Sequence, residues 1–300
     1  MNDYIMVTPA KNEEAFIQKV IDSVVMSSSV PKLWVIVNDS STDKTLNILA
    51  ENSKKYDFIK ILSLTEDHER DLTFHYSFVC KRGFEYVLKL AEEQNIDWEY
   101  IFLLDADTIL ERNYIEGLIN EMNCNLNLGI ASGNVHILKS GNIDSEYLLN
   151  DIPFGTARVW RKKCFFETGG YQITQAPDAV SMVKARLRGW KTFRFDNYTA
   201  YQLRYTSSAQ GLFIGYATRG KTVYYLNKNP LLVLMHAVQF SIEKPHYTSI
   251  FFLYGYFLSV FKNERKIDDD EIRHYFYVTR LRELYSLLIS KISCMSLSEK

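Results

Sequence analysis

The stretch Tyr100-Ile101-Phe102-Leu103-Leu104-Asp105-Ala106-Asp107 carries the strongest fold signal in the chain. Its apolar run predicts a buried strand, and two carboxylates come directly after that strand. In an open α/β sheet, ligands bind at the carboxyl ends of the strands. Two carboxylates there suit a hard divalent cation, Mg²⁺ or Mn²⁺, that holds a substrate diphosphate. An isolated Asp-x-Asp is common in solvated turns, so the interpretation depends on the residues at the ends of the other strands.

The first hundred residues alternate short apolar runs with segments of helical periodicity. This alternation is typical of a parallel sheet with crossover helices, so we predict a Rossmann-like half-domain. One crossover helix is expected around Phe16 to Val25, a second around Leu46 and Leu49, and a third over Ser77–Glu93. The predicted strands are Tyr4–Val7, Leu33–Val37, Ile59–Leu64 and Tyr100–Leu104.

After Asp107 the alternation loosens, and from Pro230 the chain becomes helical and rich in aromatic residues. We place a domain boundary near Asn229, which gives an α/β domain over 1–229, in halves 1–108 and 109–229, and a helical region over 230–300. The further predicted elements are strands at Ile130–Leu138 and Trp190–Phe195 and helices at Cys164–Thr168 and Ala179–Arg188.

The amino-acid composition limits which classes of protein this chain can belong to. The 300 residues are 47% hydrophobic, enough to bury one large core, and the net charge of -1 gives no case for nucleic acid. Between Thr156 and Lys228, thirteen basic residues face three acidic ones, which predicts a surface for phosphates or lipid headgroups. The four cysteines show no metal or disulfide spacing, and no leader is visible at the start. We therefore expect a cytoplasmic protein.

Polar clusters also stand after the first two predicted strands. Thr8-Pro9-Ala10-Lys11-Asn12-Glu13-Glu14 follows one, and Asn38-Asp39-Ser40-Ser41-Thr42-Asp43 follows the other. Either cluster alone is typical of an ordinary turn. Together with Asp105-Ala106-Asp107 they stand at the carboxyl ends of three strands, which predicts a nucleotide-sized cleft at one edge of the sheet.

In this order and spacing, the three clusters resemble those of the family 2 inverting glycosyltransferases, which have a GT-A fold. Further matches are Trp160-Arg161-Lys162-Lys163-Cys164-Phe165-Phe166, Gly169-Gly170-Tyr171, Asp178, Lys184-Ala185-Arg186 and Gly189-Trp190-Lys191-Thr192, which resemble the acceptor half of these enzymes. The resemblance covers about Tyr4 to Lys228. It implies a GT-A catalytic domain whose first half binds the nucleotide.

Carried over residue by residue, the resemblance implies roles for named positions. Those implied to contact the donor nucleotide are Pro9, Asn12, Glu13 and Asp39, with Asp39 facing the base. Asp105 would face the ribose or the metal, and Asp107 would bind the metal. Asp178 stands where the family keeps its catalytic base, although Pro177 replaces the Glu that usually precedes it.

Two further expectations concern cations near the donor. The stretch Tyr201-Gln202-Leu203-Arg204 lacks the His that often completes the metal shell, so Gln202 or water could serve. Arg219 and Lys221, on an expected loop with Gly220, are candidates to stabilise the departing diphosphate; a solvated basic turn is the alternative.

The resemblance implies that a sugar passes from a nucleotide-diphospho-sugar to a hydroxyl acceptor, in a polysaccharide or a lipid-linked glycan. Three alternatives stay open. The first is a haloacid-dehalogenase-like phosphatase, because Asp105-Ala106-Asp107-Thr108 fits the nucleophile motif of that class. The second is a nucleotidyltransferase, which would hold a nucleotide and a metal in the same way as a glycosyltransferase. The third is a non-catalytic protein that binds a nucleotide sugar and needs no catalytic base.

The aromatic-rich region has two interpretations. Between Tyr247 and Phe261, apolar side chains fall all round a helix, which indicates burial against protein or in a membrane surface. Basic residues flank this segment as interfacial anchors would; they are Lys244, Lys262, Arg265 and Lys266. The predicted length falls short of the roughly 20 apolar residues of a spanning helix. We therefore expect peripheral contact with the cytoplasmic face of a membrane through residues 230–266.

Overall fold

The computed structural model describes residues 3–65, 74–139, 142–145, 150–204, 211–286 and 289. The chain divides into two compact units, Met1–Tyr205 and Thr206–Lys300. This division lies before the boundary predicted near Asn229, and it assigns helix α7 (Leu212–Tyr225) to the second unit.

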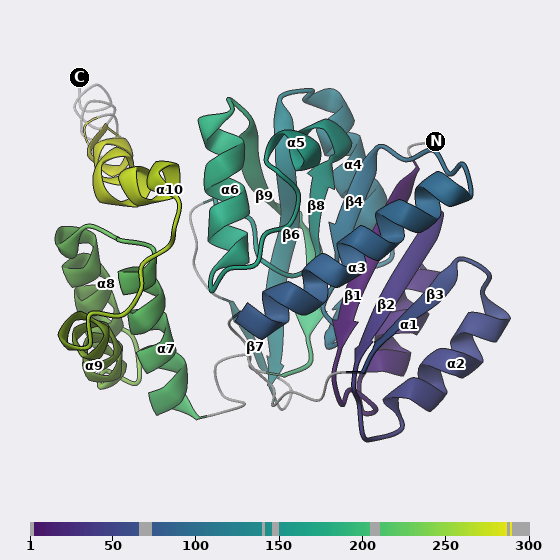
Figure 1. The fold of residues 1–300 in the computed structure, drawn as a ribbon, viewed down its shortest axis with the longest axis horizontal. Helices are drawn as coiled ribbons and strands as arrows, with labels where there is room; N and C mark the ends of the chain where they lie inside the picture. The colour runs from purple at the N-terminus through teal and green to yellow at the C-terminus, as the bar shows by residue number, and fades with distance from the viewer. Residues whose placement is uncertain are drawn as a thin grey trace. The chain divides into compact units, whose positions relative to one another are not determined.

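The first unit is built on one mixed sheet with helices on both faces (Figure 1). Its strand order is β3-β2-β1-β4-β8-β6-β9-β5, and β7 pairs with β6. Strands β1 to β4 are parallel, as predicted, whereas β8 runs antiparallel to both β4 and β6. The strands are β1 Tyr4–Ala10, β2 Leu33–Asp39, β3 Ile59–Leu64, β4 Tyr100–Leu103, β5 Thr108–Leu110, β6 Leu128–Lys139, β7 Asn142–Ser145, β8 Arg158–Arg161 and β9 Lys191–Gln202.

Alternate side chains of each central strand enter two separate cores. Tyr4 and Met6 of β1 pack with one group of helices, and Ile5 and Val7 pack with the other. Helices α1 (Ile17–Val25), α2 (Thr45–Lys55) and α4 (Tyr114–Cys124) line the first core. Helices α3 (Phe74–Glu93), α5 (Lys162–Glu167) and α6 (Pro177–Leu187) line the second and lie in front of the sheet in Figure 1. The predicted α/β class is confirmed.

The predicted basic surface of this unit is partly wrong, because several of its arginines are buried. Arg161 donates to the Met122 carbonyl at the end of α4, at 2.5 Å, and to that of Leu128 at 3.3 Å. Arg158 donates to the carbonyls of Pro153 and Phe154. A guanidinium with five donors can satisfy several buried carbonyls at once. Strand β8 was not predicted, because its Arg-Val-Trp-Arg sequence has a charged residue at each end.

The second unit is helical. Its helices are α7, α8 (Pro230–Ile242), α9 (Thr248–Phe261) and α10 (Asp270–His274), which continues into a π-helical turn at Tyr275–Thr279. Gly220 of α7 and Gly255 of α9 let the two backbones meet, since a Cβ on either glycine would overlap a carbonyl of the other helix. This close packing makes α7 part of the helical unit. Arg219 and Lys221 therefore lie within a helix, and the predicted loop around Gly220 is wrong.

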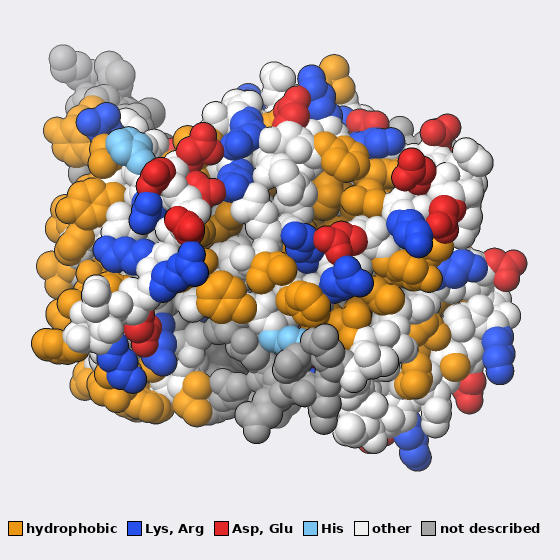
Figure 2. Space-filling view, viewed as in Figure 1, with side chains coloured by type: hydrophobic (Ala, Val, Ile, Leu, Met, Phe, Trp, Pro, Cys, Tyr) orange, Lys and Arg blue, Asp and Glu red, His pale blue; other side chains and the backbone are white. Residues whose placement is uncertain are grey.

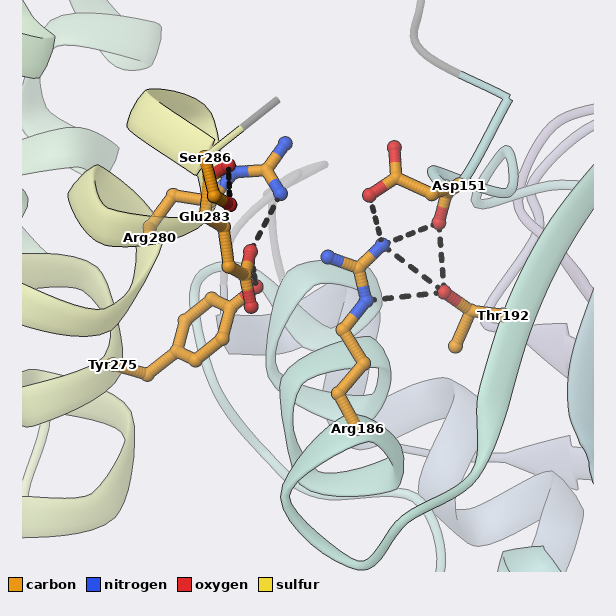
Figure 3. Close-up of polar contacts among 7 residues, drawn as sticks. All are labelled: Asp151, Arg186, Thr192, Tyr275, Arg280, Glu283 and Ser286. Carbon is orange, nitrogen blue, oxygen red and sulfur yellow. Dashed lines mark hydrogen bonds and ion pairs between the residues drawn. The ribbon is translucent and has the colours of Figure 1, made fainter. Parts of the chain in front are cut away.

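Large apolar side chains cover the outer surface of α8 and α9 (Figure 2). Among the described residues, no helix is long and apolar enough to cross a bilayer. Towards the end of the unit, the Glu283 carboxylate accepts hydrogen bonds from Tyr275 and from Arg280, both at 2.8 Å (Figure 3). These bonds tie the π-helical turn to the helical segment after it.

Candidate functional site

The loops after β1 and β2 are joined to each other by side chains of the predicted clusters. Asn12 Oδ1 accepts a hydrogen bond from the backbone amide of Thr42 at 2.8 Å, and the backbone amide of Asn12 donates one to Ser41 Oγ at 3.0 Å. Asn12 has a φ of 55°, a left-handed conformation that asparagine tolerates better than most residues. The Glu13 amide donates to Thr45 Oγ1 at 2.7 Å. Asn12 thus ties the loop after β1 to the loop after β2, while Pro9 lies inside β1, one residue before its end.

Asp39 closes β2 and is buried. His75 Nε2 lies 2.9 Å from Asp39 Oδ2, and Lys11 Nζ lies 3.6 Å from the same oxygen. Asp39 Oδ1 is also buried, and within the described ranges no donor reaches it. A buried acceptor is costly unless a donor satisfies it, so this oxygen is suited to an N–H of a ligand. No local pattern points to His75, since it lies 36 positions away from Asp39.

Asp105 lies just past β4 in a buried, acidic environment. Tyr76 donates from its hydroxyl to Asp105 Oδ1 at 2.8 Å, and the Asp105 amide donates to Thr156 Oγ1 at 3.1 Å. Burial, followed by the charges of Asp107 and Asp178, raises the pKa of Asp105 to about 7. Burial and the charge of Asp105 raise the pKa of Tyr76, so its hydroxyl stays a donor. Asp105 therefore holds a proton more readily than an exposed aspartate does.

Asp107 is buried and already contacts a cation of the protein. Arg204 Nε lies 2.7 Å from Asp107 Oδ2, and Arg204 Nη2 also pairs with Glu13 Oε1. Burial lowers the pKa of Arg204, but the charges of Asp107 and Glu13 outweigh it and the net pKa is raised. Gln202 lies on β9, opposite Thr108 of β5. In this stretch Arg204 contacts Asp107, and the expectation that Gln202 or water completes the metal shell stays a prediction.

The donor set at this point fits a divalent cation that is shared with a ligand. Asp105 and Asp107 supply the hard oxygens that Mg²⁺ and Mn²⁺ prefer. Across the described residues, no group of three or more His, Cys, Asp or Glu side chains is placed to hold a metal. Mg²⁺ is commonly bound by one or two carboxylates together with substrate phosphates. The two aspartates are consistent with a cation that binds in that way.

Asp178 stands in the first turn of α6, which begins at Pro177. Its carboxylate fits against Gly155, where a Cβ would overlap Asp178 Oδ2. Arg158 Nη1 donates to the Asp178 carbonyl at 2.9 Å and lies 3.9 Å from Oδ1. The side chain is 42% exposed, although its Oδ1 is buried and accepts no hydrogen bond from a described residue. The charge of Asp178 contributes to the raised pKa of Asp105, so the two carboxylates lie in the same electrostatic environment.

Helix α6 is fixed at its other end by a second arginine (Figure 3). Arg186 donates through Nη2 to Asp151 Oδ2 at 2.8 Å and through Nε to Thr192 Oγ1 of β9 at 3.1 Å. Thr192 in turn donates to the Asp151 carbonyl at 2.7 Å. These bonds hold α6 to the sheet and to the segment that leads to Gly155. Arg186 therefore positions the helix that carries Asp178.

The first unit brings together most of the predicted site. Strand ends and the start of α6 supply the acids Glu13, Asp39, Asp105, Asp107 and Asp178. Arg219 and Lys221 lie in the second unit, where the Arg219 guanidinium stacks 5.2 Å from the Tyr216 ring. Sequence reasoning missed the contacts of His75, Tyr76 and Arg204. These residues are 29 to 191 positions from the acids they contact.

A parallel half that ends in an aspartate pair, continued by antiparallel strands and an acidic helix start, is the GT-A architecture. Two solved structures share this fold. One is residues 1–349 of TarS from S. aureus in complex with UDP-GlcNAc, with a TM-score of 0.52 and 13% identity over 90% of this chain and 78% of that chain. The other is the mannosyltransferase PcManGT from Pyrobaculum calidifontis in complex with GDP-Man and Mn²⁺, with a TM-score of 0.53 and 11% identity over 98% of this chain and 80% of that chain.

The sequence comparisons agree with the fold. Residues 5–70 match the family model described as glycosyl transferase family 2. A poly-beta-1,6-N-acetyl-D-glucosamine synthase of Staphylococcus epidermidis is 29% identical over 132 residues, which are 44% of this chain and 28% of that protein. The chain thus matches less than a third of the length of this curated relative. Residues 5–70 are thus similar to glycosyl transferase family 2.

Proposed function

We propose that this protein is an inverting glycosyltransferase, which moves a sugar from a nucleotide-diphospho-sugar to a hydroxyl of a glycan or lipid-linked acceptor. The observation that carries the proposal is that one short segment links the carboxylates, since Thr156 Oγ1 accepts from the Asp105 amide and the adjacent Gly155 lies against Asp178 Oδ2. Asp107 and Asp178 both act on the pKa of Asp105, although they stand on different elements. An aspartate pair at a strand end suits the diphosphate side of the reaction, and an open carboxylate on another element suits the acceptor side.

The reaction needs the attacking hydroxyl to lose its proton as the sugar leaves the diphosphate. Asp178 is our proposed base, because its carboxylate is partly open while Arg158 and Gly155 fix its position. A divalent cation on Asp105 and Asp107 would neutralise the charge that develops on the leaving diphosphate. Arg219 and Lys221 remain proposed as further contacts to the donor.

The buried oxygen of Asp39 supports a choice of nucleotide. Uracil and guanine each carry a ring N–H that could donate to Asp39 Oδ1, which no described donor reaches. TarS was solved with UDP-GlcNAc and the Pyrobaculum enzyme with GDP-Man, so both bases occur among proteins of this fold. We propose a uridine or guanosine diphosphate sugar as donor, with Pro9, Asn12 and Glu13 lining its binding site.

A thermal-shift panel tests this function. A ligand that binds only the folded state stabilises it by about 2.7 kcal/mol at a concentration of 100 Kd. We expect one UDP- or GDP-sugar, with Mn²⁺, to raise Tm by several degrees, and CDP- and ADP-sugars to leave it unchanged. Stabilisation by inorganic phosphate alone, with none by any nucleotide sugar, would contradict a transferase and favour the phosphatase alternative.

The second unit supports a proposed contact with a lipid surface. On α9 the small or polar residues Thr248, Gly255 and Ser259 are buried together with Phe252, whereas Ile250 and Phe261 are 65% and 87% exposed. Small residues facing protein and large apolar residues facing outward are the pattern of helices in contact with lipid. On α8 the exposed apolar residues are Leu231, Leu234, Met235, Val238 and Ile242. One predicted anchor departs from this role, since Lys266 donates to Asn227 at 2.7 Å.

Liposome co-sedimentation tests the lipid contact. We expect the double variant Ile250→Asp, Phe261→Asp to lose at least about tenfold in affinity for anionic vesicles, because each buried apolar side chain contributes about 1.5–3 kcal/mol. The matched control is Met26→Asp, Leu126→Asp, at sites 72% and 71% exposed on the first unit. Equal binding by both variants, or no vesicle binding by the wild type, would remove the lipid proposal and leave the transferase proposal intact.

A further inference from the structure

Arg204 occupies an unusual place in the donor site. Its guanidinium pairs with two buried acids from different strand ends, Glu13 after β1 and Asp107 after β4. A divalent cation bound at Asp105 and Asp107 would need oxygens of the same Asp107 carboxylate. The positively charged side chain of Arg204 thus contacts the same carboxylate that a divalent cation would bind.

We propose that Arg204 is a resident cation that holds Asp107 until a nucleoside diphosphate enters, so that metal and nucleotide bind together rather than metal first. This inference rests on the proposed function, because it assigns the site a diphosphate ligand. Arg204 is here a positioning residue for the cation and a direct ligand of the diphosphate.

The backbone fixes Arg204 in this position. The Leu203 amide donates to the Asp107 carbonyl at 2.8 Å, directly after the β5–β9 pairing that sets Thr108 opposite Gln202. The guanidinium lies 5.6 Å from the centre of the Phe16 ring. Its position is therefore set by the sheet, and it does not depend on a flexible surface contact.

The chemistry of arginine allows an exchange between two kinds of anion. The planar guanidinium binds carboxylates and phosphates with the same fork of donors. The side chain is 24% exposed, so an entering diphosphate could reach it. When the guanidinium turns to the diphosphate, Asp107 is released to bind a divalent cation that also contacts the phosphates. Without the nucleotide, the positive charge beside Asp107 disfavours any added cation.

The expected change in divalent-cation affinity follows from the short distance between the Arg204 guanidinium and the Asp107 carboxylate. An opposite charge within about 4–6 Å changes the proton affinity of a carboxylate by about 10- to 1,000-fold. A divalent cation competes for the same oxygens, so removing the guanidinium should raise its affinity by about tenfold or more.

Mn²⁺ titration without nucleotide tests the proposal, with free Mn²⁺ measured by electron paramagnetic resonance. We expect Arg204→Gln and Arg204→Ala to bind Mn²⁺ about tenfold or more tightly than the wild type, and Arg204→Lys, which keeps the charge, to stay near it. Arg82→Gln is the matched control, because Arg82 is exposed and pairs with Glu85. Thermal melting followed by circular dichroism identifies the variants that remain folded.

A second measurement separates a ligand role from a purely structural one. In EDTA, we expect the affinity for UDP or GDP to fall about tenfold in Arg204→Gln and to stay unchanged in Arg82→Gln. Unchanged Mn²⁺ affinity in folded Arg204→Gln and Arg204→Ala would overturn the proposal, as would unchanged nucleotide affinity in EDTA. The Mn²⁺ titration contains no sugar nucleotide, so its result is independent of whether the donor panel identifies a substrate.

Discussion

We expect Asp178→Asn to lower turnover by ~10²–10⁴-fold while donor affinity stays near that of the wild type, since a positioned general base typically contributes this much. The substitution preserves shape and removes only the ability to accept a proton. Inversion occurs by one direct displacement, so the attacking hydroxyl needs a base on the acceptor side. Steady-state kinetics with the donor found in the thermal-shift panel, together with donor titration, measures both quantities.

Two further variants make this result specific. Asp97→Asn changes an exposed aspartate elsewhere on the first unit and should leave turnover unchanged. Gly155→Ala should lower turnover through position alone, because its Cβ would overlap Asp178 Oδ2. Turnover of Asp178→Asn within a few-fold of the wild type would contradict the assignment. A product that keeps the anomeric configuration of the donor, seen by NMR, would contradict inversion.

Asp107→Ala should abolish Mn²⁺-dependent binding of nucleoside diphosphate and leave the fold intact. The carboxylate stands at the open end of a strand, and its oxygens are needed by the cation. Arg204 keeps its second partner, Glu13, in this variant, so the remaining contact limits the loss of stability. Calorimetric titration of UDP or GDP, with Mn²⁺ and with EDTA, measures the effect. The same affinity as the wild type in the presence of Mn²⁺ would refute the metal assignment.

The sequence determined the parallel half of the sheet and the place of its site. Runs such as Tyr4–Val7 and Leu33–Val37 are apolar because both faces of a central parallel strand are covered. Such strands can be recognised without tertiary information, and their polar ends must share one edge of the sheet. For this reason Asp39, Asp105 and Asp107 could be named as site residues in advance. Their proposed roles still depend on the experiments above.

The antiparallel half was harder to predict, because its strands do not follow a simple apolar pattern. Arg158 and Arg161 open and close β8, and both can be buried because carbonyls of the segment just before β8 and of α4 accept their hydrogen bonds. The same holds for α7, whose assignment to the second unit follows from Gly220 and Gly255 meeting across two helices. Neither a charged strand nor a helix-contact glycine has a local signature.

What the sequence by itself determined is therefore the set of parallel strands and the polar residues that follow them, since both depend on local apolar and polar patterns. What only the tertiary structure decided is which side chains contact those acids. His75 reaches Asp39, Tyr76 reaches Asp105 and Arg204 reaches Asp107 across long separations in the chain. The charge in a buried site depends on distances between elements, and the packing of α3 and the register of β9 against β5 set those distances.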